Sequence, residues 1–229
     1  MTVVVIPWRP QQSRLAALDA VAAWYRENLD GADLRLVDCV DDVFNLSQAR
    51  NLGIASVDDP DEVVVVGDAD TLPQRESLLA AIGGAEMSGR VHLPYTEYRW
   101  LGASGTAQFT AGAQLEDCNF EPVRGACSGV YVTTPRTWAS HGGQDERFRG
   151  WGFEDAAWYI AHSTILGEPP RREQGLVFAL HHVAQPREGE QYDANATLME
   201  RYRAASGDPA AIGDLVAASA ANARLLPGC

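Results

Sequence analysis

The stretch Val63–Gln74 reads VVVVGDADTLPQ and joins four consecutive valines to two aspartates. Val63–Val66 is typical of a strand that is covered on both faces, as in a parallel sheet. Asp68 and Asp70 follow the strand's carboxyl end, which is where ligands of such sheets bind. A simple turn also favours Gly and Asp after a strand. Carboxylate oxygens suit Mg²⁺ or Mn²⁺, so the two aspartates predict a divalent-cation site at this edge of the sheet.

The segments around this strand alternate between strand and helix patterns. Apolar and β-branched runs predict further strands at 3–6 and 34–37. Helical spacing and capping residues predict helices at 13–28, at 45–56 with Asn45 or Ser47 as its cap, and at 74–82 with Gly83-Gly84 ending it. The alternation indicates an α/β fold with a Rossmann-like, mostly parallel mixed sheet flanked by helices.

The second half of the chain is less regular. Residues 94–124 lack periodicity and contain LGASGTAQFTAGAQ (101–114), which we expect to form a mobile loop. Beyond it the pattern predicts strands at 126–132 and 176–180, helices at 135–140 and 154–166, and a tail at 194–223 of two helices broken by Gly207-Asp208-Pro209. Because no repeat or clear linker interrupts the 229 residues, we expect one domain.

The charge balance limits the partners. The chain has 31 acidic and 18 basic residues, a net charge of −13, which argues against a broad nucleic-acid surface or an anionic-membrane surface. The acidic surplus is also explained by solubility alone. The first residues, MTVVVIP, lack the basic segment of a signal peptide, and no apolar run approaches the roughly 20 residues that span a bilayer. We therefore expect no membrane span and a cytoplasmic protein.

The cysteines support the same compartment. Cys39, Cys118, Cys127 and Cys229 form no CxxC pattern and have no histidine pair at zinc spacing. We expect all four to be reduced and unpaired, as is usual in the cytoplasm.

The densest stretch of unusual residues is GGQDERFRGWGFED (142–155). Gly150 and Gly152 bracket Trp151, and Glu154 and Asp155 follow at the start of a predicted helix. The helix dipole favours ionised carboxylates there, and such a carboxylate beside an aromatic side chain can take a proton from a sugar or alcohol hydroxyl. Ordinary N-terminal capping beside a buried tryptophan is the alternative interpretation.

Taken together, VVVIPWRPQQSR (3–14), VVVVGDADTLP and GGQDERFRGWGFED resemble the GT-A glycosyltransferases. The resemblance is strongest to the β-1,4-galactosyltransferase type and its bacterial and phage relatives in the broad family-2 group. The matching motifs are Pro7-Trp8-Arg9, Ala49-Arg50-Asn51-Leu52-Gly53, Asp68-Ala69-Asp70 and Gly150-Trp151-Gly152-Phe153-Glu154-Asp155, in the order of the family, over residues 3 to about 187.

The resemblance implies a nucleotide-binding half (about 1–90), an acceptor and catalytic half (about 91–190) and a helical tail (191–229). It also assigns roles to residues on the donor side. Pro7, Trp8 and Arg9 would line the nucleotide pocket, Arg50 would approach the nucleotide or diphosphate, and Asp68 would lie near the donor's ribose or sugar.

For the metal, the resemblance implies that Asp70 binds Mn²⁺ or Mg²⁺ directly, with Asp68 close by and a histidine from a later strand as a further ligand. His181 and His182 end the strand at 176–180, and neighbours on a strand point to opposite faces. Only one of them should reach the metal, and we expect it to be His182. A histidine in such a place is more often structural, so the ligand role depends on the resemblance.

On the acceptor side, Trp151 would stack under the donor and acceptor sugars, Glu154 would hold a sugar, and Asp155 would be the catalytic base. The implied activity is metal-dependent, inverting transfer of a sugar from a nucleotide sugar, expected to be a UDP-sugar, to an acceptor hydroxyl. Acceptors in this family include glycans, proteins, small molecules and modified nucleic acid. The chain departs from the galactosyltransferase type at Ala156-Ala157, where more acids are usual, so sugar specificity is not carried over.

Two other functions stay open at this point. A sugar nucleotidyltransferase would need a glycine-rich loop after the first strand, and VIPWRPQQSR has no glycine. A non-catalytic sugar-binding module on the same fold is the second alternative. Five arginines near the motifs suit an anionic acceptor such as modified DNA or a phosphorylated glycan, although we favour their pairing with the surplus acids. They are Arg147, Arg149, Arg171, Arg172 and Arg187.

Overall fold

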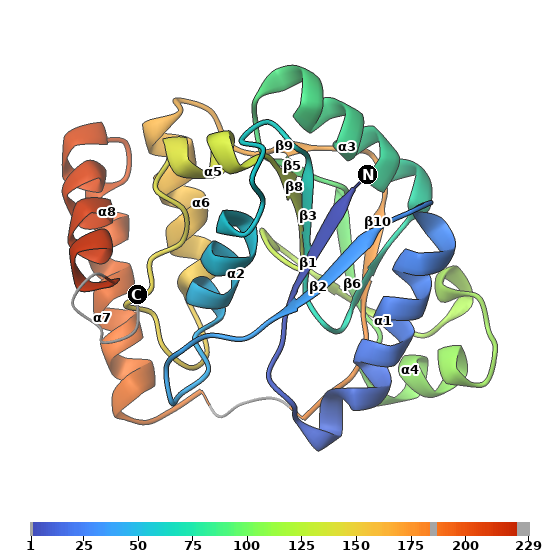
Figure 1. Ribbon diagram of the computed structural model, residues 1–229. Coiled ribbons are helices and arrows are strands. Elements are labelled where there is room, and N and C mark those ends of the chain that lie inside the picture. Colours follow the sequence, from blue (N-terminus) through green and yellow to red (C-terminus); the bar gives the residue numbers. More distant parts are fainter. Residues whose placement is uncertain (1, 184–186, 224–229) are drawn as a thin grey trace.

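The computed structural model describes residues 2–183 and 187–223 (Figure 1). The expected alternation of strands and helices is present over the first 88 residues. Its elements are β1 (Val3–Pro7), the 3₁₀ turn η1 (Gln12–Arg14), α1 (Leu15–Asn28), β2 (Asp33–Val37), α2 (Leu46–Ala55), β3 (Val64–Gly67), β4 (Thr71–Pro73) and α3 (Arg75–Ser88). Asn45 is the N-cap of α2, because its Oδ1 accepts a hydrogen bond from the Gln48 amide at 3.0 Å.

The second half adds short strands and five more α-helices in the described residues. They are β5 (His92–Leu93), β6 (Glu97–Trp100), α4 (Gly102–Thr110), the 3₁₀ turn η2 (Leu115–Asp117), β7 (Glu121–Val123), β8 (Val130–Thr133), α5 (Pro135–Ser140), α6 (Glu154–Ile165), β9 (Arg171–Arg172), β10 (Leu176–Ala179), α7 (Glu190–Ala205) and α8 (Pro209–Ala223). The helix expected at 135–140 and the two-part helical tail are confirmed. β8 begins later than expected, because Gly129 before it has a left-handed backbone with φ 89°.

The strands form two sheets, with the orders β2-β1-β3-β8-β5-β9 and β4-β10-β6-β7. β3 runs parallel to β1, with Val65 opposite Val4, and antiparallel to β8, with Val65 opposite Val132. The predicted mixed α/β sheet is therefore present. The valines of β3 are buried on both faces, which explains the uninterrupted apolar run in the sequence.

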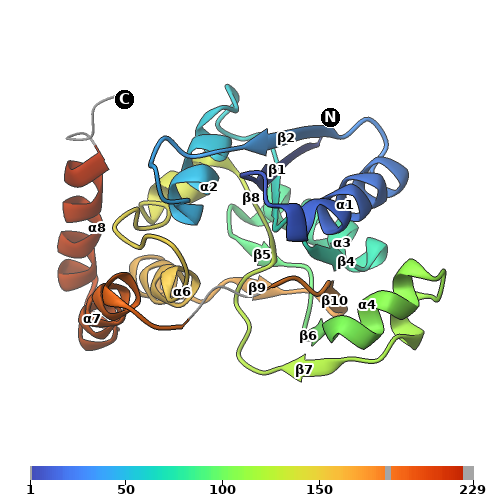
Figure 2. The same cartoon turned by 90° about the horizontal axis from the view of Figure 1, so that it is seen from below.

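Helices cover both faces of the six-stranded sheet (Figure 2). α1 and α3 lie on one face, and α2 and α6 lie on the other. Gly53 lets α2 approach closely, because a Cβ there would lie 2.2 Å from Cγ1 of Val5 in β1. This close contact places the first turns of α2 beside the carboxyl ends of β1 and β3.

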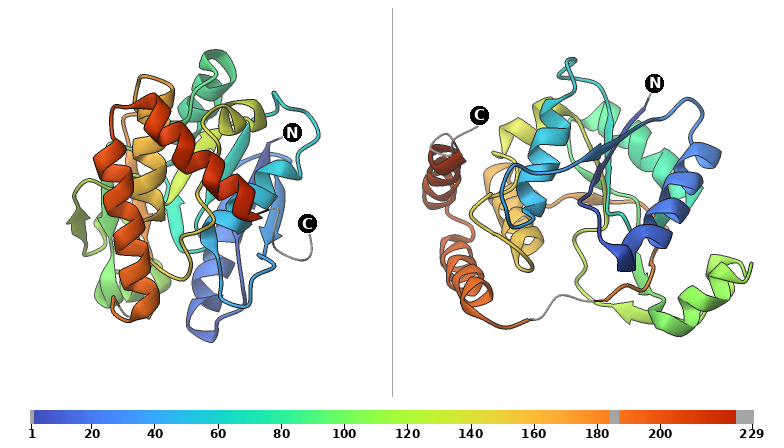
Figure 3. Two further views of the ribbon diagram at one scale, coloured as in Figure 1. Left: turned by 90° about the vertical axis from the view of Figure 1, so that its left-hand side faces the viewer. Right: turned by 60° about the horizontal axis from the view of Figure 1, so that its bottom comes forward.

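The tail builds a second apolar core on the outer side of α6. Its buried members come from the loop before α6 and from α6, α7 and α8, and they are Phe148, Ala157, Ala161, Leu198, Met199, Tyr202, Ala205, Ile212 and Leu215. Figure 3 shows α8 running obliquely across α7 and α6. The tail thus supports the helix that begins with Glu154 and Asp155.

The predicted end of α3 was wrong. The helix continues through Gly83 and Gly84 to Ser88, and Gly89, with φ 60°, is its left-handed C-cap. Gly84 instead permits close packing, because a Cβ there would lie 2.4 Å from Cε1 of His92 in β5. The two glycines of the sequence therefore mark a helix–strand contact and not a helix end.

The mobile loop expected at 101–114 was also wrong, because α4 occupies most of it. Within α4 only Gly105 is buried, so the helix has no apolar stripe for the sequence to show. Gly105 lies against the segment that follows η2, where a Cβ would be 2.0 Å from the carbonyl oxygen of Asn119. This glycine therefore serves close packing.

Two further expectations concern thiols and membranes. Cys39, Cys118 and Cys127 are free, as expected, and Cys229 lies outside the described residues. Among the helices that the structure describes, none has both the length and the apolar character needed to cross a bilayer.

Candidate active site

Arg50 is the centre of the candidate site. It lies on α2, its side chain is fully buried, and it pairs with two carboxylates from different parts of the chain. Nη2 donates to Oδ1 of Asp68 at 2.7 Å, and Nη1 donates to Oδ1 of Asp155 at 2.7 Å. Burial would lower the pKa of Arg50, but the carboxylates of Asp155 and Asp68 outweigh it and raise the pKa. A buried arginine therefore joins the end of β3 to the start of α6.

Two residues that the sequence analysis missed complete this cluster. Gln144 accepts from Nη1 of Arg50 at 3.1 Å and donates to the hydroxyl of Tyr131 at 3.2 Å. The Tyr131 hydroxyl donates to Oδ1 of Asp155 at 3.2 Å, and its ring lies 5.2 Å from the guanidinium carbon of Arg50. Gln144 precedes the GWG motif and Tyr131 lies in β8, so only folding brings them to Arg50.

Asp155 is held through one oxygen. In the part of the chain described, each hydrogen bond to its side chain, from Arg50, Tyr131 and Gln144, goes to Oδ1. The side chain keeps 21% of its surface exposed. Oδ2 is consequently the oxygen available to a bound molecule.

Glu154 differs from its neighbour. Its side chain is buried, which raises its pKa to about 8, and the adjacent charge of Asp155 adds to the effect against the opposing effect of Arg50. The expectation that the helix dipole keeps both acids ionised was therefore wrong for Glu154, because burial outweighs the dipole. At pH 7 its carboxyl group is mostly protonated and is able to donate a hydrogen bond.

Asp68 is also affected by burial. Its pKa is raised to about 6, first by burial and then by the charges of Asp155 and Asp70, while Arg50 acts to lower it. Burial also raises the pKa of Tyr98, and the carboxylates of Asp70, Asp68 and Asp155 raise it further. The charges of all three carboxylates thus affect the pKa of Tyr98, and two of them, Asp68 and Asp155, share Arg50 as their ion-pair partner.

Asp70 faces a histidine instead of an arginine. Nε2 of His182 lies 2.9 Å from Oδ2 of Asp70, and this contact raises the pKa of His182. The side chain of His181 lies elsewhere, with its ring 6.0 Å from that of Trp100. The two histidines therefore diverge, as expected for neighbours at a strand end, and His182 is the one beside Asp70.

The chemistry of this pair fits a divalent cation. A carboxylate oxygen and an imidazole nitrogen both suit Mn²⁺, and the two side chains are 12% and 19% exposed, so a further ligand can reach them. Within residues 2–183 and 187–223, no group of three or more Asp, Glu, His and Cys side chains is arranged to hold a metal. A cation held by Asp70 and His182 would need oxygen ligands from a bound molecule.

The GWG loop has a special backbone. Gly150, Gly152 and Phe153 have φ values of 70°, 105° and 76°, all left-handed. Phe153 is the one non-glycine residue of this kind in the described residues, and such strain persists only where the surroundings enforce it. Asn195 on α7 does so, since its Nδ2 donates to the carbonyl oxygens of Arg149 at 2.9 Å and of Trp151 at 3.4 Å.

The loop presents Trp151 at the surface. Its ring is 36% exposed and nearly parallel to that of Tyr192 on α7, at 11° with centroids 6.3 Å apart. The guanidinium of Arg187 lies over the Trp151 ring at 4.6 Å. The structure thus places Trp151 four residues from Asp155 on an accessible aromatic surface.

The Pro-Trp-Arg motif joins the end of β1 to the loop after β2. Pro7 ends β1, and the Trp8 amide donates to the Val37 carbonyl oxygen at 2.8 Å. Arg9 bonds to the carboxylate of Asp38 at 2.9 Å and to the carbonyl oxygens of Cys39, Asp41 and Asp42, which fixes the loop after β2. Its role at a nucleotide stays a prediction, and its side chain is committed to this loop.

Comparison with known proteins identifies the architecture. No protein-family model matches the sequence, and no curated protein is detectably similar to it in sequence. The catalytic domain of Drosophila β1,4-galactosyltransferase 7 with xylobiose matches with a TM-score of 0.56 and 15% identity, over 85% of this chain and 79% of that one. The chain has the GT-A fold.

Two other solved structures agree with the GT-A assignment. GalNAc-T7 with UDP, GalNAc and Mn²⁺ matches with a TM-score of 0.54 and 10% identity, over 96% of this chain and 55% of that one. M. tuberculosis glucosyl-3-phosphoglycerate synthase matches with a TM-score of 0.51 and 13% identity, over 90% and 80%. The chain spans 64% of the length of a second structure of the Drosophila enzyme, so parts of these proteins have no counterpart here.

The five arginines near the motifs have different partners. Arg147 pairs with Asp145 at 2.5 Å, and Arg149 lies 3.4 Å from Asp41, which confirms pairing with surplus acids for these two. Arg172 donates to the carbonyl oxygen of Ala126 and Arg171 is exposed. Arg187 has the aromatic partner already described.

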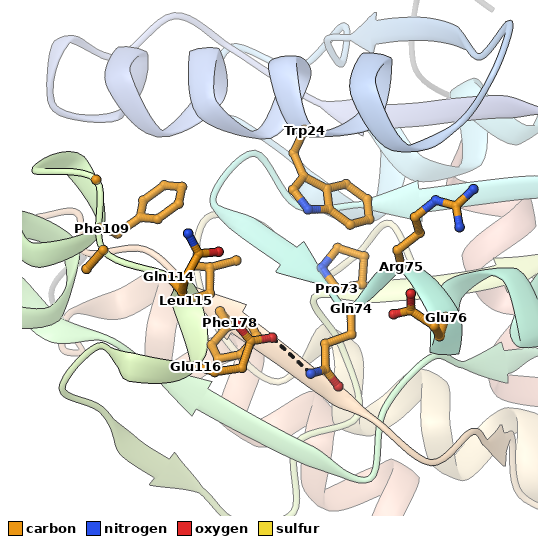
Figure 4. A pocket seen from close by; sticks show the side chains of 12 residues that line it. Trp24, Pro73, Gln74, Arg75, Glu76, Phe109, Gln114, Leu115, Glu116 and Phe178 are labelled. Carbon is orange, nitrogen blue, oxygen red and sulfur yellow. Dashed lines mark hydrogen bonds between the residues drawn. The ribbon is translucent and has the colours of Figure 1, made fainter.

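A cavity of about 420 Å³ is lined by residues other than Asp68, Asp70 and Asp155 (Figure 4). Trp24 of α1 and Phe109 of α4 face it, and Gln74 bonds to Glu116 across it at 3.0 Å. Its lining includes none of the candidate metal, donor or catalytic residues. The candidate site is instead formed by Asp68, Asp70, Asp155 and Trp151, whose side chains keep part of their surface exposed.

Proposed function

We propose that the chain is a metal-dependent, inverting glycosyltransferase that transfers a sugar from a nucleotide sugar, specifically a UDP-sugar, to an acceptor hydroxyl. The observation that carries the proposal is the buried Arg50, which pairs with Asp68 and Asp155 and so brings the DxD motif and the start of α6 together. The GT-A neighbours support it, because the GalNAc-T7 structure holds UDP, GalNAc and Mn²⁺ and the Drosophila enzyme holds xylobiose.

On the donor side, Asp70 and His182 would hold Mn²⁺ or Mg²⁺ together with diphosphate oxygens. When bound, the cation supplies positive charge that stabilises the departing diphosphate. Asp68 forms an ion pair with Arg50. Its side chain keeps 24% of its surface exposed, which suits contact with the donor's ribose or sugar. Arg50 is fully buried and already holds two carboxylates, so we assign it a positioning role in place of diphosphate binding.

On the acceptor side, Asp155 would act as the base. Oδ1 is fixed by Arg50 and Tyr131, and Oδ2 would accept the proton from the acceptor hydroxyl as its oxygen attacks the donor sugar. Protonated Glu154 would donate a hydrogen bond to a sugar oxygen. Trp151 would orient the sugars by stacking, and such positioning lowers the barrier by making the reaction effectively intramolecular. Attack opposite the leaving diphosphate inverts the anomeric centre.

The test is an Asp155→Asn variant assayed with a panel of nucleotide sugars and acceptors. Transfer should fall at least about a hundredfold, because general-base catalysis contributes that much, while donor binding stays within a few-fold of wild type. The amide oxygen keeps an acceptor for Arg50, which limits structural damage. Wild-type turnover by this variant would remove Asp155 from the role.

The products separate this proposal from the alternatives. A glycosyltransferase releases nucleoside diphosphate, and the release should depend on added Mn²⁺ or Mg²⁺. Release of pyrophosphate from sugar phosphate and nucleoside triphosphate would indicate a nucleotidyltransferase. Sugar binding with no turnover of any nucleotide sugar would indicate a non-catalytic module. The single-domain division and the cytoplasmic location stay predictions from the sequence.

A further inference from the structure

The loop that precedes α6 carries the exposed Trp151, and an arginine lies against its ring. Arg187 is exposed, and its guanidinium lies 4.6 Å above the ring of Trp151. Arg147 and Arg149 of the same region pair with carboxylates, but no acidic side chain of the described residues lies within salt-bridge distance of Arg187. Arg171 and Arg172 also lack an acidic partner among the described residues, so the feature that marks out Arg187 is its contact with the ring of Trp151.

Stacking on Trp151 orients the guanidinium without using its hydrogen-bond donors. The contact with the ring is not a hydrogen bond, so it leaves the five N–H donors of the guanidinium for another partner. A planar fork of this kind matches the two oxygens of a carboxylate or phosphate. Arg187 is therefore preorganised to bind an anion at the edge of the Trp151 ring.

The surroundings favour a ligand over a chance contact. Asn195 fixes the loop that carries Trp151, and Tyr192 lies nearly parallel to the tryptophan ring. Arg149 adds a second cation near the same loop, with its Nε 3.4 Å from Asp41 and 40% of its side chain exposed. The aromatic surface and the cation thus lie together on a supported loop, four residues before Asp155 in the sequence.

We propose that this surface is an acceptor subsite for an acidic saccharide, whose sugar ring contacts Trp151 while its carboxylate or phosphate binds Arg187. This inference rests on the proposed function and names the substrate class of the same site. Long polyanions such as DNA fit it less well, because the net charge of −13 repels them beyond this one position. A small saccharide with a single charged group needs only Trp151 and Arg187.

The test measures binding of matched saccharides by ligand-observed NMR and calorimetry. The probes are methyl glucuronide, methyl galacturonide, glucose 6-phosphate and mannose 6-phosphate, each compared with its neutral parent sugar, with and without MnCl₂ and UDP. Wild type should bind the acidic members of at least one pair about tenfold more tightly, because a charged hydrogen-bonded pair contributes that much. The uronides and the phosphates distinguish the two sources of negative charge.

Variants tie the preference to one residue. Arg187→Ala should remove the preference for acidic saccharides, Arg187→Lys should restore part of it, and Arg203→Ala should leave it intact, since Arg203 lies on α7 and pairs with Glu200. Equal affinity for acidic and neutral members, no measurable binding of any acidic member, or a preference that survives Arg187→Ala would each overturn the inference.

A separate assay keeps the two proposals apart. The same wild-type protein is tested for release of nucleoside diphosphate from UDP-sugars, with water or a saccharide as acceptor. Absence of release contradicts the proposed function. If wild type shows no preference for acidic saccharides in the binding assay, the acidic acceptor is contradicted and the proposed function is not.

Discussion

The centre and the rim of the candidate site are built in different ways. In the centre, the buried Arg50 forms ion pairs of 2.7 Å with Asp68 and with Asp155. The three residues come from different parts of the chain. The rim consists of the Asp70–His182 pair and the Trp151–Arg187 stack, whose side chains keep part of their surface exposed. Folding therefore fixes the centre before any ligand binds, whereas ligands can displace the contacts of the rim.

The largest effect should come from breaking the centre. Arg50→Ala leaves the Asp68 and Asp155 carboxylates facing each other without their shared cation, so the free energy of unfolding should fall by about 3 kcal/mol and activity should be lost. Urea unfolding followed by fluorescence measures the stability. Arg203→Ala, on the surface of α7, is the matched control and should be unchanged. A stability of Arg50→Ala within 1 kcal/mol of wild type would contradict the view of Arg50 as the centre.

Substituting a residue of the rim should weaken metal binding and leave the stability of the fold nearly unchanged. His182→Ala should weaken Mn²⁺ activation about ten- to a hundredfold, with activity recovered at high Mn²⁺, because one of two protein ligands is lost. Stability should change by less than about 0.5 kcal/mol, since the side chain is partly exposed. The measurement is activity against Mn²⁺ concentration, with His181→Ala as the control. An effect of His181→Ala equal to that of His182→Ala would mean that the structure does not separate their roles.

The support of the rim can be tested by substituting Asn195, which is not itself part of the rim. Asn195→Ala removes hydrogen bonds to the strained loop around Trp151, and about 1–2 kcal/mol of stability should go with them. The Michaelis constant for the acceptor should rise more than that for the donor, because the loop lies on the acceptor side. Thr197→Ala, on the same helix, is the control. Equal changes for donor and acceptor would show that Asn195 supports the fold as a whole.

Glu154→Gln should change the free energy of unfolding only slightly at low pH. The pKa of Glu154 is raised to about 8 in the folded state from an ordinary value of 4.5, so the folded state holds a proton that the unfolded state has released. Stability from this group is present below pH 4.5 and is lost as pH rises towards 8.

Glutamine mimics the protonated acid, so wild type and variant should differ by less than about 1 kcal/mol at pH 5. The variant should then lose less stability between pH 5 and 8. Chemical denaturation across this range measures the slope. Parallel slopes for the two proteins would show that Glu154 titrates near its ordinary pKa.

The sequence by itself determined the alternating first half and the residues of the centre. The valine run of β3, the cap of α2 and the helix starting at Glu154 are local patterns, because strands and helices follow from spacing and capping within a few residues. Asp68 and Asp155 were singled out on the same local basis and on resemblance, and Arg50 on resemblance alone.

Only the tertiary structure decided how these residues are used. It showed that Gly84 and Gly105 serve close packing, that Arg9 holds a loop, and that burial raises the pKa of Glu154. Gln144 and Tyr131 joined the centre although the sequence assigned neither of them a role, even though Gln144 lies within the 142–155 stretch. The physical reason is that burial, charge pairing and close approach depend on residues far apart in the chain, which a local pattern does not contain.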